Sequence, residues 1–144
     1  MRRLSNRVLI VFLLAIPTSL GTLALSDSAG ATGGTICSAL SGNLSRPNEH
    51  LTECTTSTTG GSGLLSGNGH VDTVTWKNGG TTTFVIKIGS GNLLCPDGSS
   101  AIEIRSTVKK STGAASSITG KVSADVCITG KGRVSLLPGT VWKF

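Results

Sequence analysis

Apolar and polar residues alternate along much of the chain, and a period of two is typical of β-strands with one buried and one exposed face. Residues 102–108 show this alternation, and residues 118–128 show it again. No long window has the three-and-four spacing of an amphipathic helix, and glycine interrupts nearly every long stretch. The pattern therefore predicts antiparallel strands whose inner phase includes Ile102, Ile104, Val108, Ile118, Val122, Ala124, Val126 and Ile128.

The clearest hairpin signal surrounds Asn78-Gly79-Gly80. A two-residue Asn-Gly turn would divide the flanking apolar residues between both faces. A three-residue loop at these positions instead pairs Val74 with Phe84 and Trp76 with Thr82, which leaves one apolar face. We predict the three-residue loop, with one of its two glycines at positive φ, and a core position for Trp76.

Two polar segments, residues 55–63 and 109–117, are expected to be loops, and the first is expected to be mobile. Counting the hairpin and the two alternating segments, the chain offers about eight short strands joined by glycine-rich turns. This organisation predicts an all-β fold, either a small antiparallel β-sandwich or a barrel. The remaining strands are expected at residues 35–44, 50–54, 63–66, 133–137 and 140–144.

The N-terminus has the features of a secretory signal peptide. Three arginines precede an apolar run, and the small residues Ala29-Gly30-Ala31 follow it. A membrane anchor is the alternative, but proline, serine, threonine and glycine dilute the 18 residues from 8 to 25. We predict that residues 1–31 are cleaved and that residues 32–144 form a single secreted domain.

Cleavage changes the charge of the chain. The full sequence has 13 basic and 7 acidic residues, a net charge of +6, and loss of three arginines and Asp27 leaves 10 minus 6, or +4. The remaining basic residues are dispersed, and aromatic residues make up 3% of the chain. Nucleic-acid binding needs a basic stripe with stacking aromatics, so we expect no nucleic-acid partner. The mild positive charge favours solubility, and it could also favour contact with anionic envelope polymers.

All four cysteines, Cys37, Cys54, Cys95 and Cys127, lie in the predicted mature domain. An even number in a small exported domain indicates two disulfides, and the absence of a C-x-x-C pair disfavours a metal site. Three pairings are possible. We favour Cys37–Cys54 and Cys95–Cys127, because near neighbours can pair before the sheet is complete, and each bridge would contribute roughly 3 to 4 kcal/mol. Cys127 falls in the outer phase of its strand, so either its disulfide lies outside the sheet or a bulge changes the phase there.

A series of short motifs runs in order through most of residues 32–144. They are Cys37 with Leu40-Ser41-Gly42, Thr59-Gly60-Gly61-Ser62-Gly63, Trp76-Lys77-Asn78-Gly79 with Thr81-Thr82-Thr83, Val126-Cys127, and Lys131-Gly132 with Leu136-Leu137-Pro138-Gly139-Thr140-Val141-Trp142. The series resembles the small secreted proteins of actinobacteria that carry no assigned function. The resemblance implies export and an all-β, disulfide-bonded domain, and it transfers no catalytic or binding residue.

Candidate chemistry is sparse. His50 with Glu53, and His70 with Asp72, could each supply metal ligands or a base with its orienting partner, but a surface-loop histidine is the favoured interpretation. Ser62 lies in a glycine-rich stretch and lacks the G-x-S-x-G context of an activated nucleophile. A glycosidase pair would need two of the carboxylates Glu49, Glu53, Asp72, Asp97, Glu103 and Asp125. We predict no catalytic, cofactor-binding or metal-binding residue.

These features favour a secreted, non-enzymatic β-domain that binds at the cell envelope or outside the cell. The sequence does not assign a ligand to this domain, and the partners considered are an envelope component or an extracellular protein. No stable membrane insertion is expected after cleavage. The alternative is a small inhibitor of extracellular enzymes that presents the turn Cys95-Pro96-Asp97-Gly98. In the first case the functional surface is expected on the loops at residues 55–63 or 109–117.

Overall fold

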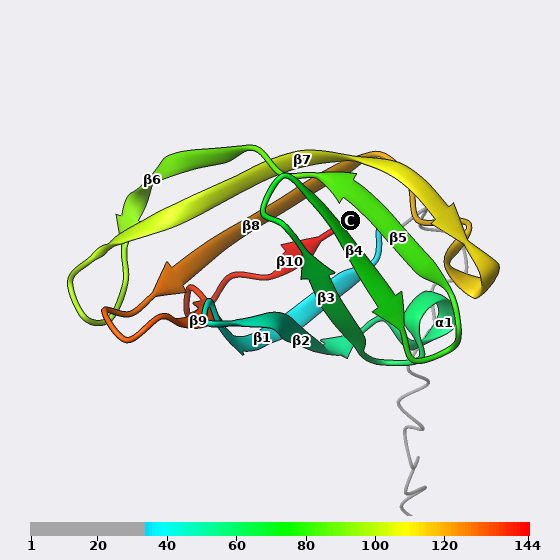
Figure 1. The fold of residues 1–144 in the computed structure, drawn as a ribbon, viewed down its shortest axis with the longest axis horizontal. Helices are drawn as coiled ribbons and strands as arrows, with labels where there is room; N and C mark the ends of the chain where they lie inside the picture. Colours follow the sequence, from blue (N-terminus) through cyan, green and yellow to red (C-terminus); the bar gives the residue numbers. More distant parts are fainter. Residues whose placement is uncertain (1–33) are drawn as a thin grey trace, which may run out of the picture. The chain divides into compact units, whose positions relative to one another are not determined.

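The computed structural model describes residues 34–144 (Figure 1), so the predicted signal peptide and its cleavage site lie outside the described residues. The regular secondary structure of the described part is almost entirely strand. They are β1 (Ile36–Asn43), β2 (Arg46–Cys54), β3 (Gly63–Gly67), β4 (Val71–Trp76), β5 (Thr81–Val85), β6 (Ile88–Leu94), β7 (Ser100–Thr112), β8 (Lys121–Ile128), β9 (Arg133–Leu136) and β10 (Trp142–Lys143), with the helical turns α1 (Thr56–Thr59) and η1 (Gly113–Ala115).

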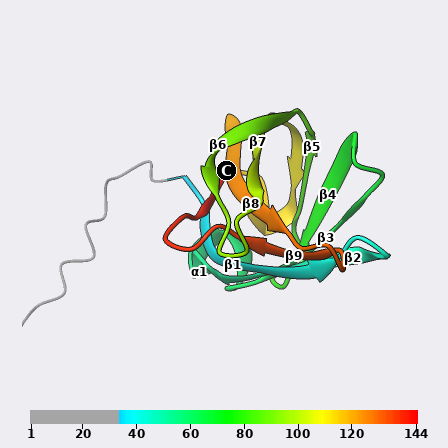
Figure 2. The ribbon, with the colours of Figure 1, turned by 90° about the vertical axis from the view of Figure 1, so that its left-hand side faces the viewer.

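Eight of the strands close into an antiparallel β-barrel, seen from two directions in Figures 1 and 2. The order around the wall is β8-β9-β1-β2-β3-β4-β5-β7, and pairing of β7 with β8 completes the circle. Strand β10 pairs with both β1 and β8, and β6 extends the edge of β7. The predicted all-β fold is confirmed, and of its two alternatives the barrel is the observed one.

Among residues 34–144, no helix has the length and apolar character needed to span a membrane.

The inner faces of the strands are those that the alternation predicts. Val74, Trp76 and Phe84 are fully buried, and the inner phase of β8 is buried from Val122 to Val126. Trp76 is therefore a core residue, as predicted.

The predicted register of the β4–β5 hairpin is wrong by two residues. Val74 pairs with Thr82, and the backbone N–H of Trp76 donates to the carbonyl of Gly80 across 2.8 Å, so the three-residue loop is 77–79. Gly79 has a positive φ of 89°. It occupies the last position of the loop, which is left-handed in three-residue hairpin loops. Gly80 instead packs against η1, where an added Cβ would lie 2.6 Å from the backbone nitrogen of Ala115. Because a shift of two residues preserves the alternation, the predicted faces are still correct.

Two predicted loops need correction, and one strand was not predicted. Residues 56–59 form the helical turn α1, in which Thr59 Oγ1 donates to the carbonyl of Thr55 across 2.6 Å. Strand β7 continues through the predicted loop at 109–117 as far as Thr112, because its threonines and lysines pair with β5. The glycine-rich segment 88–94 forms the unpredicted strand β6, which pairs with β7 alone.

One end of the barrel, here called the closed end, is covered by α1, η1 and the β4–β5 turn (Figure 1). The backbone N–H of Asn78 donates to the carbonyl of Thr59 across 3.4 Å, which joins the turn to α1. Beneath this cover, aromatic rings fill the barrel with centroid separations between 5.2 and 6.1 Å. The aromatic cluster consists of Trp76, Phe84, Trp142 and Phe144.

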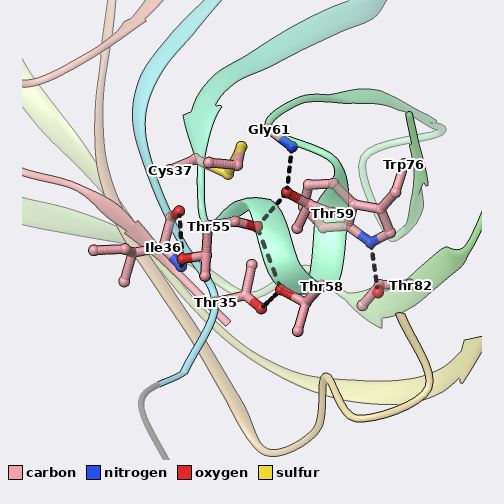
Figure 3. The surroundings of a disulfide bond; sticks show 10 residues. Thr35, Ile36, Cys37, Thr55, Thr58, Thr59, Gly61, Trp76 and Thr82 are labelled. Carbon is pink, nitrogen blue, oxygen red and sulfur yellow. Dashed lines mark hydrogen bonds between the residues drawn. A yellow bond between two sulfur atoms is a disulfide. The ribbon is translucent and has the colours of Figure 1, made fainter. Parts of the chain in front are cut away.

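Both favoured disulfides are present. Cys37 and Cys54 are register partners on β1 and β2, and their bridge lies beside α1 at the closed end (Figure 3). The Cys95–Cys127 bridge joins the start of the β6–β7 turn to β8. Cys127 does lie in the outer phase, and with Leu137 it belongs to a second small apolar cluster that is separate from the main core. Of the two alternatives for Cys127, the disulfide outside the sheet is the correct one.

Candidate functional site

The barrel interior is not filled toward the end opposite α1, and a cavity of about 420 Å³ remains there. Its walls are mainly inward-facing aliphatic side chains from β1, β3 and β7 to β9, and Trp142 of the aromatic cluster also lines it. An eight-stranded barrel is just wide enough to be filled by side chains or to hold one small ligand. This barrel is filled at the closed end and leaves room for a ligand at the other.

The cavity opens to the surface at a rim of exposed apolar residues. Leu44 in the β1–β2 turn is 60% exposed, and Ile88 at the start of β6 is 65% exposed, yet both line the cavity. The rim is held by backbone hydrogen bonds between turns, from Leu44 to the carbonyl of Gly132 and from Ile86 to the carbonyl of His70, both at 2.9 Å. Exposed apolar residues around a concave site are typical of binding sites.

Two carboxylates, Glu49 and Asp72, line this otherwise apolar cavity. Glu49 lies on β2 opposite Leu65, and Asp72 lies on β4 opposite Gly67, so strand β3 separates them. Gly67 has no side chain, and a Cβ there would collide with Asp72 Oδ1. The missing side chain on β3 therefore leaves the space that the Asp72 carboxylate occupies.

A second glycine makes room for Glu49. A Cβ at Gly42 on β1 would lie 2.5 Å from the Cγ of Glu49. Glycine is found in strands where another group approaches the backbone closely. Gly42 and Gly67 together allow both acidic side chains to lie along the inner wall.

The two carboxylates differ in their surroundings. Asp72 is buried, at 8% exposure, and its Oδ1 accepts the backbone N–H of Gly69 in the β3–β4 turn across 3.1 Å. Glu49 is half-buried. Burial raises the pKa of Glu49 above 4.5, the Asp72 carboxylate raises it further, and a hydrogen bond from the backbone of Glu49 itself acts in the opposite direction. The cavity thus disfavours the ionised form of Glu49 relative to a carboxylate in water.

The structure does not bring the histidine pairs that the sequence analysis considered together as sites. His50 is exposed on β2, and His70 is exposed in the β3–β4 turn. Asp72 lines the cavity inside the barrel, and its carboxylate accepts the backbone N–H of Gly69. It is therefore not hydrogen-bonded to the imidazole of His70, the partner considered from the sequence. Within residues 34–144, no group of three or more histidine, cysteine or acidic residues could hold a metal ion.

The other candidates lie elsewhere. Ser62 follows α1 at the closed end, away from the cavity. Glu53 is exposed, and it has a positive φ of 54° beside Cys54. Glu103 forms an ion pair with Arg105 that raises the pKa of the guanidinium, through a hydrogen bond first and charge second.

The turn proposed for enzyme inhibition is exposed and ordered. Asp97 Oδ1 accepts the backbone N–H of Ser99 at 3.0 Å and its hydroxyl at 2.6 Å, and these bonds lower the pKa of Asp97. The backbone N–H of Gly98 donates to the carbonyl of Cys95 across 2.9 Å, so the turn is tied to the disulfide.

Sequence reasoning missed Glu49 and Asp72 as a pair, although a signal was present. Asp72 has the same alternation phase as Val74 and Trp76, and Glu49 has the same phase as Leu51. A charged residue in the inner phase of a strand is unusual and marks a functional candidate.

Comparisons of the chain with protein-family models, with curated proteins and with solved structures give no match.

Proposed function

We propose that residues 32–144 are a secreted, non-enzymatic binding domain that holds a small apolar molecule inside the barrel. The observation that carries this proposal is the 420 Å³ cavity with its apolar rim. Small-molecule sites are usually concave, mostly apolar, roughly 300–1,000 Å³ in volume and provided with a few polar groups. The cavity has each of these properties.

The chemistry around the cavity supports binding over catalysis. Its titratable side chains among the described residues are Glu49 and Asp72, and apart from Asn68, Trp142 and two glycines the other lining residues are aliphatic. Glycosidase carboxylates act in a cleft that also hydrogen-bonds the sugar hydroxyls, and an aliphatic wall offers few such partners. The arrangement therefore favours an apolar ligand held reversibly.

Two disulfides in a small domain favour an oxidising compartment. The predicted signal peptide gives the same location, outside the cell or at the envelope. A barrel that encloses an apolar molecule could carry it through an aqueous space, where the free molecule is poorly soluble.

Titration with 1-aminonaphthalene, a neutral apolar fluorophore whose 11 heavy atoms fit the 420 Å³ cavity at roughly 30 Å³ per atom, tests the proposal. We expect saturable binding of one molecule per domain, with a blue shift of the emission as the dye leaves water. Ile128→Trp should weaken binding at least about ten-fold, because Ile128 lines the cavity and the larger ring would occupy it. Leu93→Trp is the matched control, because Leu93 is 50% exposed on β6 and does not line the cavity. Absence of saturable binding, or equal binding by both variants, would show that the cavity is not the site.

A second candidate is the enzyme inhibitor, which the ordered, exposed turn at Asp97 favours. Such an inhibitor should block an extracellular protease in a one-to-one complex, and Cys95→Ala with Cys127→Ala should abolish the inhibition by releasing the turn. Inhibition that survives loss of the bridge, or no inhibition across the main protease classes, would exclude this candidate.

A further inference from the structure

The charge of the cavity is opposite to that of the domain. Residues 32–144 have 10 basic and 6 acidic side chains, a net charge of +4. The cavity nevertheless has no lysine, arginine or histidine among its described lining residues, and Glu49 and Asp72 are its titratable groups. A ligand in this cavity therefore meets a negative environment.

Neither carboxylate forms a salt bridge with any residue that the structure describes. Within residues 34–144, the one salt bridge joins Glu103 and Arg105, which are not at this site. The Asp72 residue is more than nine-tenths buried, its Oδ1 accepts one backbone N–H, and its Oδ2, which is not fully enclosed, has no hydrogen-bond donor in the described part of the chain. Burying a charge without a partner is costly, and buried charges in proteins are normally paired.

The raised pKa of Glu49 agrees with this geometry. Desolvation and a second carboxylate both disfavour the ionised form, and a cation between the two groups would reverse both effects. The cavity thus stores an electrostatic cost that a positively charged ligand would relieve.

We propose that the ligand is a cationic amphiphile whose ammonium group binds between Glu49 and Asp72 and whose apolar body contacts the aliphatic walls. This inference rests on the proposed function, since it names the class of molecule that the same cavity binds. A bare metal ion fits less well, because calcium takes six to eight oxygen ligands and the described lining offers three side chains that contain oxygen, Glu49, Asp72 and Asn68.

Three probes with the same tail and different heads test the inference: octylammonium, octanol and octanoate. Each has at most ten heavy atoms, and at roughly 30 Å³ per atom, the volume of a liquid water molecule, each fits within the 420 Å³ cavity. Isothermal titration at pH 8 keeps the amine protonated. We expect octylammonium to bind about 10- to 100-fold tighter than octanol, the range for hydrogen bonds to a charged group, and octanoate to bind weakest.

Charge-neutral variants identify the groups responsible. Glu49→Gln combined with Asp72→Asn should remove the preference for the cation, so that octylammonium binds this variant no tighter than octanol does. The control Glu53→Gln with Asp125→Asn makes the same chemical changes at positions that do not line the cavity, and it should retain the preference. Circular dichroism of each variant establishes that the barrel is folded.

The outcomes separate this inference from the proposed function. Equal affinity for all three probes would overturn the cationic ligand and leave an apolar-ligand function intact. No binding of any probe would overturn both proposals. Tightest binding of octanoate, or a preference for octylammonium that persists in the neutral cavity variant, would overturn the assignment to Glu49 and Asp72. Displacement of octylammonium by calcium at comparable concentration would show a metal site in place of an amine site.

Discussion

Thr82→Val tests how the closed end of the barrel is held together. Thr82 is fully buried, and its Oγ1 accepts the indole N–H of Trp76 across 2.9 Å (Figure 3). The same hydroxyl lies 3.2 Å from the Oγ of Ser111, which donates to the carbonyl of Ile118 across 2.6 Å. A chain of polar groups thus crosses an otherwise apolar core. Valine has nearly the same shape as threonine and removes the central acceptor.

The expected loss of stability follows from two opposing effects. An indole N–H left buried without a partner costs ~1–3 kcal/mol, and the methyl group that replaces the hydroxyl returns at most ~0.8 kcal/mol. We therefore expect Thr82→Val to lower the free energy of unfolding by ~1–2 kcal/mol. The 113 residues of 32–144 give an unfolding entropy of roughly 240 cal/mol/K, so the midpoint should fall by about 6 °C.

Urea and thermal unfolding, followed by tryptophan fluorescence and circular dichroism, measure this loss. Thr83→Val is the matched control: its hydroxyl lies 2.9 Å from that of Thr73 on the half-buried outer face, where water can replace it. We expect a change within about 0.5 kcal/mol for the control. In a double-mutant cycle, Trp76→Phe should remove most of the penalty of Thr82→Val. If Thr82→Val is as stable as Thr83→Val, or the coupling is zero, the hydrogen bond does not stabilise the closed end as argued.

Two further predictions concern the cavity and the outer disulfide. The pKa of Glu49 is raised in the folded state, so the folded protein holds this proton more tightly than the unfolded chain does. The resulting stabilisation is fully present below about pH 4.5 and is lost as the pH rises through the folded-state pKa of Glu49. Glu49→Gln should therefore match the wild type in acid and be more stable at pH 7 to 8; a constant difference across this range in urea unfolding would contradict the burial argument. Replacing Cys95 and Cys127 by alanine opens a loop with a sequence separation of 32 and should cost ~4 kcal/mol in the same assay, whereas a loss below ~1 kcal/mol would show that the bridge does not constrain the unfolded chain.

Much of the barrel wall could be predicted because burial follows the alternation. The inner phases of β4, β5 and β8 are correct, since one apolar face must turn away from water wherever it pairs. Strand β6 escaped prediction because its Gly89-Ser90-Gly91 segment has low β-propensity and no buried face. Its place depends on pairing with β7 and on the nearby Cys95–Cys127 bridge, which are contacts between distant parts of the chain.

The cavity could not be predicted, because unfilled volume is a property of the closed barrel. Alternation identifies which side chains point inward, but the space between them depends on the diameter of the barrel and on how the aromatic cluster packs. Asp72 could have been recognised from its phase. Glu49 was harder to recognise, because the predicted strand began at His50, whereas β2 begins at Arg46 and continues through Pro47.

The position of the aromatic cluster has a consequence for how the protein can change. The rings and threonine hydroxyls that stabilise the fold occupy one end of the barrel, and the residues that meet a ligand occupy the other. Tolerance to substitution should therefore form a gradient along the barrel axis, low near Trp76 and high at rim positions such as Leu44 and Ile88. Libraries in which the rim positions are randomised should therefore yield variants that bind new ligands and still fold. This makes the barrel a scaffold for engineered binding proteins.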